Sequence, residues 1–364
     1  MPPPPCQLDH EVDRVPSPAA ARLVSCRAGG TNPSEEGAAS TSVSTPPSAS
    51  PAPALQSQEA AKWFPYARHG WEWKGHRINY HTAGCGKPVL LVHGFGANAR
   101  HWRKTVPALV AEGYKVYAID LLGFGESDKP GDMGFEFKTE EWRDLVLDFC
   151  LEFVNEPVTL VGNSIGSLTC ILAAAGAKER GVPVRGLVLL NTAGAMNNKG
   201  VSEDWRVILA LPLFSLIDAL LKIPAVSQSL FNGFRSRDNI RQVLSQVYDN
   251  QANVDDDLVE LIYLPSEDKG ALETFVSILT GPPGPRPDKL VREGKVDVPI
   301  LFLWGDKDPF TPMDGPIGQY FKGLPEERDD VTFVTLPSVG HCPHDDRPDL
   351  VHAEMLPWLE NLHA

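Results

Sequence analysis

The sequence predicts an α/β fold: a mostly parallel, twisted sheet with helices on both faces and a helical cap inserted between two strands. Two observations carry this prediction. From residue 63 onward, short apolar runs alternate with stretches of helical periodicity. Between residues 194 and 294 the alternation stops and only helical patterns occur, which is typical of an insertion over one edge of a sheet.

The composition is that of a soluble globular protein, with 42% hydrophobic and 22% charged residues among 364. The net charge of −14 argues against a nucleic-acid partner. The six cysteines are scattered and form no CxxC pair, so we expect neither a disulfide framework nor a zinc site. We expect no cofactor, and the composition leaves the oligomeric state open.

Residues 1–62 differ in kind from the rest of the chain. The first 60 residues hold 11 of the 33 prolines, and none of the 30 aromatic residues precedes Trp63. Such a segment cannot bury enough apolar surface to offset the entropy of ordering, so we predict a disordered tail. Arg, Ser and small residues at 19–28 favour an organelle transit peptide, whereas the acidic residues at 9–13 favour a plain flexible tail.

The core of the fold is expected at 63–193 and 295–364. Residues 71–82 predict a hairpin with its turn at Lys74-Gly75. Further strands are expected at 88–94, 115–120, 157–162, 185–191, 299–305 and 331–336. Helices are expected at 102–112, 140–153, 165–178 and 348–362. Strands that alternate with helices in this way build a parallel sheet.

The cap at 194–294 carries helical patterns at 205–223 and 253–264, followed by a GPPGPRP loop. The first pattern is strongly apolar, but Pro212 interrupts it, and a spanning helix needs about 20 apolar residues in a row. We interpret it as a buried or substrate-facing cap helix, with peripheral membrane contact through the cap as the alternative.

A G-x-S-x-G motif stands at residues 162–166, directly after an apolar strand and before an apolar helix. The string alone is weak evidence, but this strand–turn–helix setting is the one that a nucleophile elbow requires. Glycines on both sides allow a strained turn that pushes the serine side chain outward. The motif therefore predicts Ser164 as a catalytic nucleophile.

A serine hydroxyl needs a base to remove its proton, and a histidine base needs a carboxylate to orient it. In hydrolases of this motif the acid follows the serine in the chain and the histidine comes last. His341, just past strand 331–336, is the predicted base. We expect the competing residues His344 and His352 to face solvent or to pack against other side chains. Asp308 is the predicted acid, and Asp306, closer to the strand end, is the alternative.

The negative charge that develops on the substrate oxygen needs fixed hydrogen-bond donors. The turn after strand 88–94 offers the backbone N–H of Phe95, and the residue after the nucleophile offers the N–H of Ile165 at a helix N-terminus. We predict these two as the oxyanion hole. His93 precedes the glycine turn, where a structural hydrogen bond is the expected role.

Five motifs together resemble the plastid hydrolases of plants and algae that include the chlorophyll dephytylase and pheophytinase relatives. They are VHGFGANARHWR, YAIDLLGFGESDKP, VGNSIGS, LWGDKDPFTP and GHCPHDDRP. The resemblance covers residue 63 to the end and implies the α/β-hydrolase fold, esterase-type hydrolysis without a metal, and import into the chloroplast. Ser167 departs from the pattern, because many relatives carry another glycine there.

The function that we predict is a serine hydrolase that cleaves an ester through a Ser-His-Asp triad and an acyl-enzyme. An apolar cap favours a small hydrophobic ester as substrate. Epoxide hydrolases and haloalkane dehalogenases share the fold but use an aspartate nucleophile, so Ser164 argues against both. Two alternatives stay open at this point: a carbon–carbon bond hydrolase of ketone substrates, and a catalytically weak small-molecule receptor.

Overall fold

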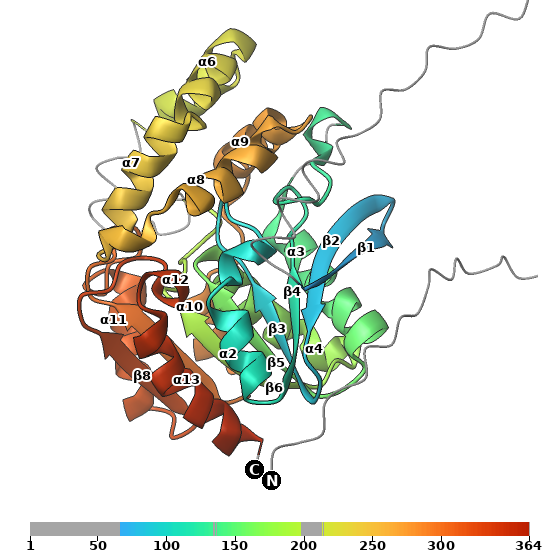
Figure 1. Cartoon of the computed structure of the whole chain (residues 1–364), viewed down its shortest axis with the longest axis vertical. Coiled ribbons are helices and arrows are strands. Elements are labelled where there is room, and N and C mark those ends of the chain that lie inside the picture. Colours follow the sequence, from blue (N-terminus) through green and yellow to red (C-terminus); the bar gives the residue numbers. More distant parts are fainter. Residues whose placement is uncertain (1–65, 134, 136, 198–212, 214, 364) are drawn as a thin grey trace, which may run out of the picture. The chain divides into compact units, whose positions relative to one another are not determined.

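The computed structural model describes residues 66–133, 135, 137–197, 213 and 215–363 (Figure 1). Its centre is one eight-stranded sheet with the strand order β1-β2-β4-β3-β5-β6-β7-β8. The strands are β1 (Ala67–Trp73), β2 (His76–Ala83), β3 (Lys87–Val92), β4 (Tyr114–Ile119), β5 (Val158–Asn163), β6 (Val184–Leu190), β7 (Ile300–Gly305) and β8 (Val331–Leu336). The β1–β2 and β2–β4 pairs are antiparallel and all other neighbours are parallel, so the predicted mostly parallel sheet is confirmed.

The predicted hairpin is confirmed by β1 and β2, which pair from Ala67–Thr82 to Trp73–His76. Its two turn residues both have positive φ, 48° at Lys74 and 79° at Gly75. Two-residue turns with positive φ match the right-handed twist of the flanking strands.

Helices cover both faces of the sheet because the central strands are apolar on both sides. On β3, Leu90 and Val92 face one core cluster, together with α3 (Thr139–Phe149), α4 (Ile165–Arg180) and α11 (Pro316–Gly323). Val89 and Leu91 face the other cluster, with α2 (Thr105–Ala111) and α13 (Pro348–Leu362). Figure 1 shows α2 and α13 on the near side of the sheet.

Two predicted helices differ from the structure at their ends. The expected helix at 102–112 is split into a 3-10 turn, Ala99–Trp102, and α2. The split arises because the Asn98 side chain accepts from the Arg100 N–H and fixes a tight turn before α2 begins. The expected helix at 140–153 ends at Phe149 and continues as a π turn, Cys150–Val154, closed by Asn155 at a φ of 53°.

We use the name helical insertion for the segment that joins β6 to β7. The described part of this segment contains helices and no strand. The longer helices are α6 (Pro224–Phe234), α7 (Arg237–Val247), α8 (Asp256–Tyr263), α9 (Ala271–Thr280) and α10 (Pro287–Arg292). The predicted tail at 1–62 and residues 205–212 and 214 of the predicted helix at 205–223 lie outside the described residues.

The first turn of α4 lies directly against the end of β3. A Cβ atom placed on Gly166 would lie 2.1 Å from the carbonyl oxygen of Val92 and 2.5 Å from that of His93. Both neighbours are backbone atoms of a buried strand end, so neither has room to move. Only glycine therefore allows the helix to begin at this point of the sheet.

We expect Gly166→Ala to lower the free energy of unfolding by about 2–3 kcal/mol, because the added methyl group overpacks against fixed backbone. Urea denaturation measures the change. Gly233→Ala is the matched control: Gly233 lies within α6 and has no atom within 4 Å of the added Cβ, so the helix should gain up to about 1 kcal/mol. Equal effects at the two positions would contradict the close approach of α4 to β3.

Candidate active site

Ser164 occupies the turn between β5 and α4 in a strained backbone conformation. Its φ is 56° and its ψ is −119°, a region that residues other than glycine rarely adopt, and such strain costs of order 1–3 kcal/mol. Hydrogen bonds hold the turn in place, because the Ser164 N–H donates to Leu190 O at 2.9 Å and its carbonyl accepts from Leu168 N. This conformation is the one expected of a nucleophile elbow.

Asp308 and His341 form a hydrogen-bonded pair on the two loops that follow β7 and β8. His341 Nδ1 lies 2.8 Å from Asp308 Oδ2, and the two residues are 7% and 6% exposed. Parallel neighbouring strands end at the same edge of the sheet, which is why residues 33 positions apart meet. With a proton on Nδ1 directed at the carboxylate, Nε2 is the nitrogen left to act on a third group.

The carboxylate of Asp308 is kept ionised although it is buried. Burial opposes its negative charge, but the His341 imidazole and side-chain hydrogen bonds from Thr311 and Asn191 outweigh this and lower the pKa of Asp308 below its ordinary value. Oδ2 accepts from Asn191 Nδ2 at 2.5 Å and from the Thr311 hydroxyl. Oδ1 accepts from the backbone N–H of Phe310 at 2.7 Å and of Thr311 at 3.1 Å.

Asn163 is a further residue of the site that sequence reasoning missed. Its Nδ2 donates to the carbonyl of His341 at 3.0 Å and to Leu190 O at 3.3 Å. A Cβ on Gly94 would lie 3.1 Å from Asn163 Oδ1 and 3.4 Å from Ser164 Cβ. Asn163 thus links the serine turn, the turn after β3 and the loop that carries His341, which we call the histidine loop. The only feature of the sequence that could have indicated this role was its place beside Ser164.

The two predicted oxyanion donors belong to residues next to the serine turn, since Ile165 follows Ser164 and Phe95 follows Gly94, whose Cβ would lie 3.4 Å from Ser164 Cβ. Ile165 is the first residue of α4 and Phe95 follows Gly94 in the turn after β3. Within the described part of the chain, neither backbone N–H has a protein hydrogen-bond partner. His93 has the structural role that we expected: its Nδ1 bonds Gly94 O at 2.7 Å, and Leu121 N donates to its Nε2 at 3.0 Å.

The competing residues lie in other settings. Asp306 Oδ1 accepts from Val339 N at 3.4 Å and contacts its neighbour Lys307, so it stabilises its own loop. His344 is buried against Trp102, with their ring centroids 4.1 Å apart. His352 Nε2 lies 3.4 Å from the Thr105 hydroxyl.

Ser167, the departure from the family pattern, fits the start of α4 without crowding. Its single hydroxyl proton donates to Gly162 O at 2.7 Å, with Leu190 O at 3.1 Å as the alternative acceptor, and its oxygen accepts from Leu190 N at 3.1 Å. The side chain therefore joins α4 to β5 and β6 through satisfied buried hydrogen bonds.

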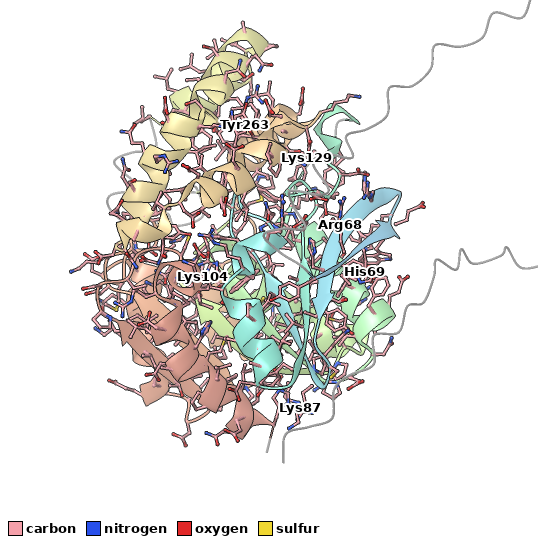
Figure 2. All side chains as sticks on the ribbon, viewed as in Figure 1. Arg68, His69, Lys87, Lys104, Lys129 and Tyr263 are labelled. Carbon is pink, nitrogen blue, oxygen red and sulfur yellow. The ribbon has the colours of Figure 1, made fainter. Side chains whose placement is uncertain are left out.

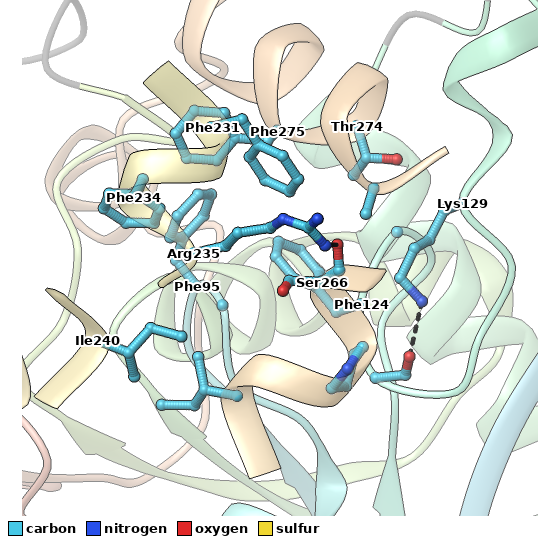
Figure 3. Close-up of a pocket in the computed structure, with 16 residues that line it drawn as sticks. Phe95, Phe124, Lys129, Phe231, Phe234, Arg235, Ile240, Ser266, Thr274 and Phe275 are labelled. Carbon is cyan, nitrogen blue, oxygen red and sulfur yellow. Dashed lines mark hydrogen bonds between the residues drawn. The ribbon is translucent and has the colours of Figure 1, made fainter. Parts of the chain in front are cut away.

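A cavity lies between the loops after β3 and β4 and the helical insertion (Figure 3). Its volume is about 80 Å³, and it is partly open to solvent. Its wall is mainly aromatic and apolar, with Phe95, Phe124, Phe231, Phe234, Ile240, Ile262 and Phe275. Of the five predicted site residues, all of which the structure describes, Phe95 is the one on this wall.

Two cations on the cavity wall are already engaged by the protein. Lys129, labelled in Figure 2, donates from Nζ to Gly125 O, as Figure 3 shows, and also binds Asp268, both at 2.7 Å. Arg235 Nη1 donates to Ser266 O at 3.1 Å. In the part of the chain that the structure describes, no group of three or more His, Cys, Asp or Glu side chains could hold a metal ion.

A family model described as the alpha/beta hydrolase family matches residues 89–354. This match covers more than half of the chain, and the chain belongs to the alpha/beta hydrolase family. The family and fold that the sequence motifs predict are therefore confirmed.

Among curated proteins, the chain is similar to the chloroplastic pheophytinase of Arabidopsis thaliana. The two are 29% identical over 333 residues, 80% of this chain and 66% of that protein. The chain is also 30% identical over 213 residues to 2-hydroxymuconate semialdehyde hydrolase of Pseudomonas sp. strain CF600, 57% of this chain and 64% of that protein. The chain thus spans about two thirds of the length of these relatives.

Solved structures agree on the fold. The epoxide hydrolase CorEH superposes with a TM-score of 0.65 at 20% identity, over 81% of this chain and 99% of that one. The serine hydrolase CarC, involved in carbazole degradation, superposes with a TM-score of 0.61 at 24% identity and the same coverage.

A cluster of buried polar side chains lies beneath the histidine loop. His101 Nε2 lies 2.7 Å from the Tyr248 hydroxyl, which donates to Asp345 at 3.1 Å, and His101 Nδ1 lies 3.2 Å from His344 Nε2. Burial lowers the pKa of His101 to about 4, although the Asp345 carboxylate opposes this shift. Burial also lowers the pKa of His344 well below its usual range. Both imidazoles are therefore neutral in the folded protein at pH 7.

Because the unfolded chain protonates its histidines near pH 6.5, it binds more protons than the folded protein below that pH. We expect the free energy of unfolding to fall as the pH drops from about 6.5 to about 4, by up to about 1.4 kcal/mol per pH unit from His101 alone. Urea denaturation at several pH values measures this slope. His101→Gln should have a shallower slope, and parallel curves for the two proteins would refute the assignment.

Proposed function

We propose that this protein is a serine hydrolase that cleaves carboxylic esters of hydrophobic substrates. The observation that carries the proposal is the 2.8 Å hydrogen bond between His341 and Asp308, on the sheet edge where Ser164 holds its strained turn. A strained serine, a histidine with a free Nε2 and an ionised carboxylate are the parts that acyl transfer needs.

In the proposed reaction, Ser164 Oγ attacks the ester carbonyl while His341 Nε2 takes its proton. Asp308 holds His341 in the required tautomer and stabilises the imidazolium. The N–H groups of Phe95 and Ile165 bind the oxyanion, and Ile165 adds the positive end of α4. His341 then gives its proton to the leaving alcohol, which leaves an acyl-enzyme. Water, deprotonated by His341, attacks this acyl group, and the released serine recovers the proton as the acid departs.

The helical insertion acts in this proposal as the cap that selects the substrate. Helices α6, α7 and α9 supply Phe231, Phe234, Ile240 and Phe275 to the cavity, and Phe95 joins the cavity to the oxyanion site. A wall of this kind favours an apolar acyl or alcohol group, since burial of each methylene contributes about 0.8 kcal/mol.

Cleavage of a carbon–carbon bond is the second candidate. The similarity to 2-hydroxymuconate semialdehyde hydrolase favours it, because a serine, a histidine and an aspartate could also serve a ketone substrate. The similarity to pheophytinase and the aromatic cavity favour the ester. The name of the Arabidopsis relative also supports a chloroplast location, which stays a prediction.

Contact with a membrane surface also stays a prediction. Exposed apolar side chains follow one another along the described residues before and within α6: Leu213, Leu216, Ile217, Leu220, Ile223, Leu230 and Phe234. None of the described helices has the length and apolar character needed to traverse a bilayer.

A fluorophosphonate probe should label the wild-type protein, because the probe reacts with an activated serine. We expect Ser164→Ala to abolish labelling and Asp308→Asn to slow it by about 10³–10⁴-fold, since Asn no longer fixes the tautomer of His341. Asp306→Asn is the matched control and should keep its rate within about twofold. A folded wild-type protein that stays unlabelled would refute the proposal and leave the receptor alternative.

The cavity predicts a preference for long acyl chains. Among p-nitrophenyl esters from acetate to palmitate, kcat/KM should rise with chain length by at most about fourfold per buried methylene. Phe231→Ala, which removes a cavity wall, should flatten this profile. Leu230→Ala changes the neighbouring residue, which is exposed and away from the cavity, and should leave the profile intact. A flat wild-type profile would contradict the proposed substrate class.

A further inference from the structure

The loop that carries His341 is held from one side by the helical insertion. The His341 N–H donates to Val247 O, at the end of α7, at 2.8 Å. A Cβ on Gly340 would lie 2.0 Å from the same Val247 oxygen. Cys342 is part of an apolar cluster whose other buried members all belong to the insertion: Ile240, Leu244, Val247, Tyr248, Val254, Leu258 and Val259. Three consecutive residues of the histidine loop thus contact the insertion.

Asp346 lies in the short helix α12 (Pro343–Asp346). Its carboxylate bonds both the loop that carries His341 and the helical insertion. Oδ2 accepts from the Gly340 N–H at 2.7 Å and from the Asp249 N–H at 3.1 Å. Oδ1 accepts from the Asn250 N–H at 2.8 Å, and the Asp346 carbonyl accepts from Asn253 Nδ2 at 2.7 Å. The Asp346 side chain is fully buried, so its charge is tolerated only with these donors in place.

Its neighbour Asp345 makes contacts of a different kind. Asp345 accepts from Arg103 at 2.9 Å and from the Tyr248 hydroxyl, and Lys104 donates to its carbonyl at 2.7 Å (Lys104 is labelled in Figure 2). The bonds from Arg103 and Lys104 fasten α12 to the segment before α2, and the bond from Tyr248 fastens it to the end of α7. Of the two aspartates, only Asp346 bonds Gly340, the residue that precedes His341.

We propose that Asp346 is a positioning residue for His341, and that through it the helical insertion sets the place of the catalytic base. The inference rests on the proposed function, since it concerns the histidine of that site. Asp346 acts without touching the substrate: it fixes Gly340 against residues 249–250, and Val247 holds the His341 backbone beside it.

Helix α7 gives this arrangement a functional consequence. Ile240, near its start, lies on the cavity wall, and Val247, at its end, holds His341. Figure 1 shows α7 running from the outer part of the insertion toward the core. One rigid helix therefore contacts both the substrate cavity and the loop of the base, and filling of the cavity restricts the movement of both.

The test is Asp346→Asn, which keeps the side-chain volume but replaces one acceptor oxygen by a donor that faces a backbone N–H. We expect kcat to fall at least about 100-fold with KM within about threefold, because His341 serves acylation and deacylation alike. The rate of fluorophosphonate labelling should fall in parallel. Asp255→Asn is the matched control: Asp255 caps α8 in the same insertion and contacts Arg103, but not the histidine loop, and Asn is an equally good cap.

A second readout is independent of catalysis. The low-field proton resonance of the His341 Nδ1–H in its bond to Asp308 should broaden or vanish in Asp346→Asn and persist in Asp255→Asn. If the wild-type protein shows this resonance but no labelling, the proposed function fails while the positioning role is still measured. If Asp346→Asn does not fold, Asn253→Ala removes one bond to Asp346 and should lower kcat several-fold.

A folded Asp346→Asn protein with kcat within threefold of wild type and an intact resonance would overturn the inference. An equal loss of kcat in Asp255→Asn would also overturn it, because the effect would then reflect general loosening of the insertion.

Discussion

The close approach of α4 to the end of β3 is the constraint on which the rest of the site depends. Gly166 lets the helix begin against the Val92 and His93 carbonyls, and this fixes how sharply the chain must turn at Ser164. This turn costs a positive φ at Ser164, which is held by hydrogen bonds to Leu190 of β6 and to Leu168 of α4. The same approach places the turn after β3 beside Ser164, so one packing contact sets both the proposed nucleophile and the proposed backbone donors.

The second part of the site is a buried charge that the fold stabilises with directed donors. Asp308 has five hydrogen bonds, from His341, Asn191, Phe310 and Thr311, and these keep it ionised despite its burial. A carboxylate that stays charged across the working pH range fixes the proton of His341 on Nδ1. The strain at Ser164 and the burial of Asp308 are both unfavourable by themselves, and both are maintained by contacts from β6 and its following loop.

The sequence was sufficient for the strands, the elbow motif and the family, because these depend on local patterns. Apolar runs define buried strands, and a Gly-x-Ser-x-Gly string between a strand and a helix defines the turn. The supporting residues were not predictable in this way. Asn163 and Asn191 act through partners 178 and 117 positions away, and Asp346 acts through backbone N–H groups. Isolated polar residues of this kind have no distinguishing sequence pattern. Two helix ends also differed from the prediction. A side-chain cap produces the 3-10 turn that ends at Trp102, and a π turn follows the helix that ends at Phe149.

In the simplest description, the sheet carries the catalytic residues of such a fold and the helical insertion separately selects the substrate. Here the division is incomplete, because the histidine loop contacts α7 and the following segment through Gly340, His341, Cys342 and Asp346. A change that repacked α7 would displace His341, the proposed base, unless these contacts were kept. The outer helix α6 and the first turns of α9 supply cavity residues but do not contact this loop through any bond of the described residues. Residues of α6 and α9 can therefore change the shape of the cavity without moving His341. Changes in α7 are constrained, because Val247 at its end bonds the His341 backbone.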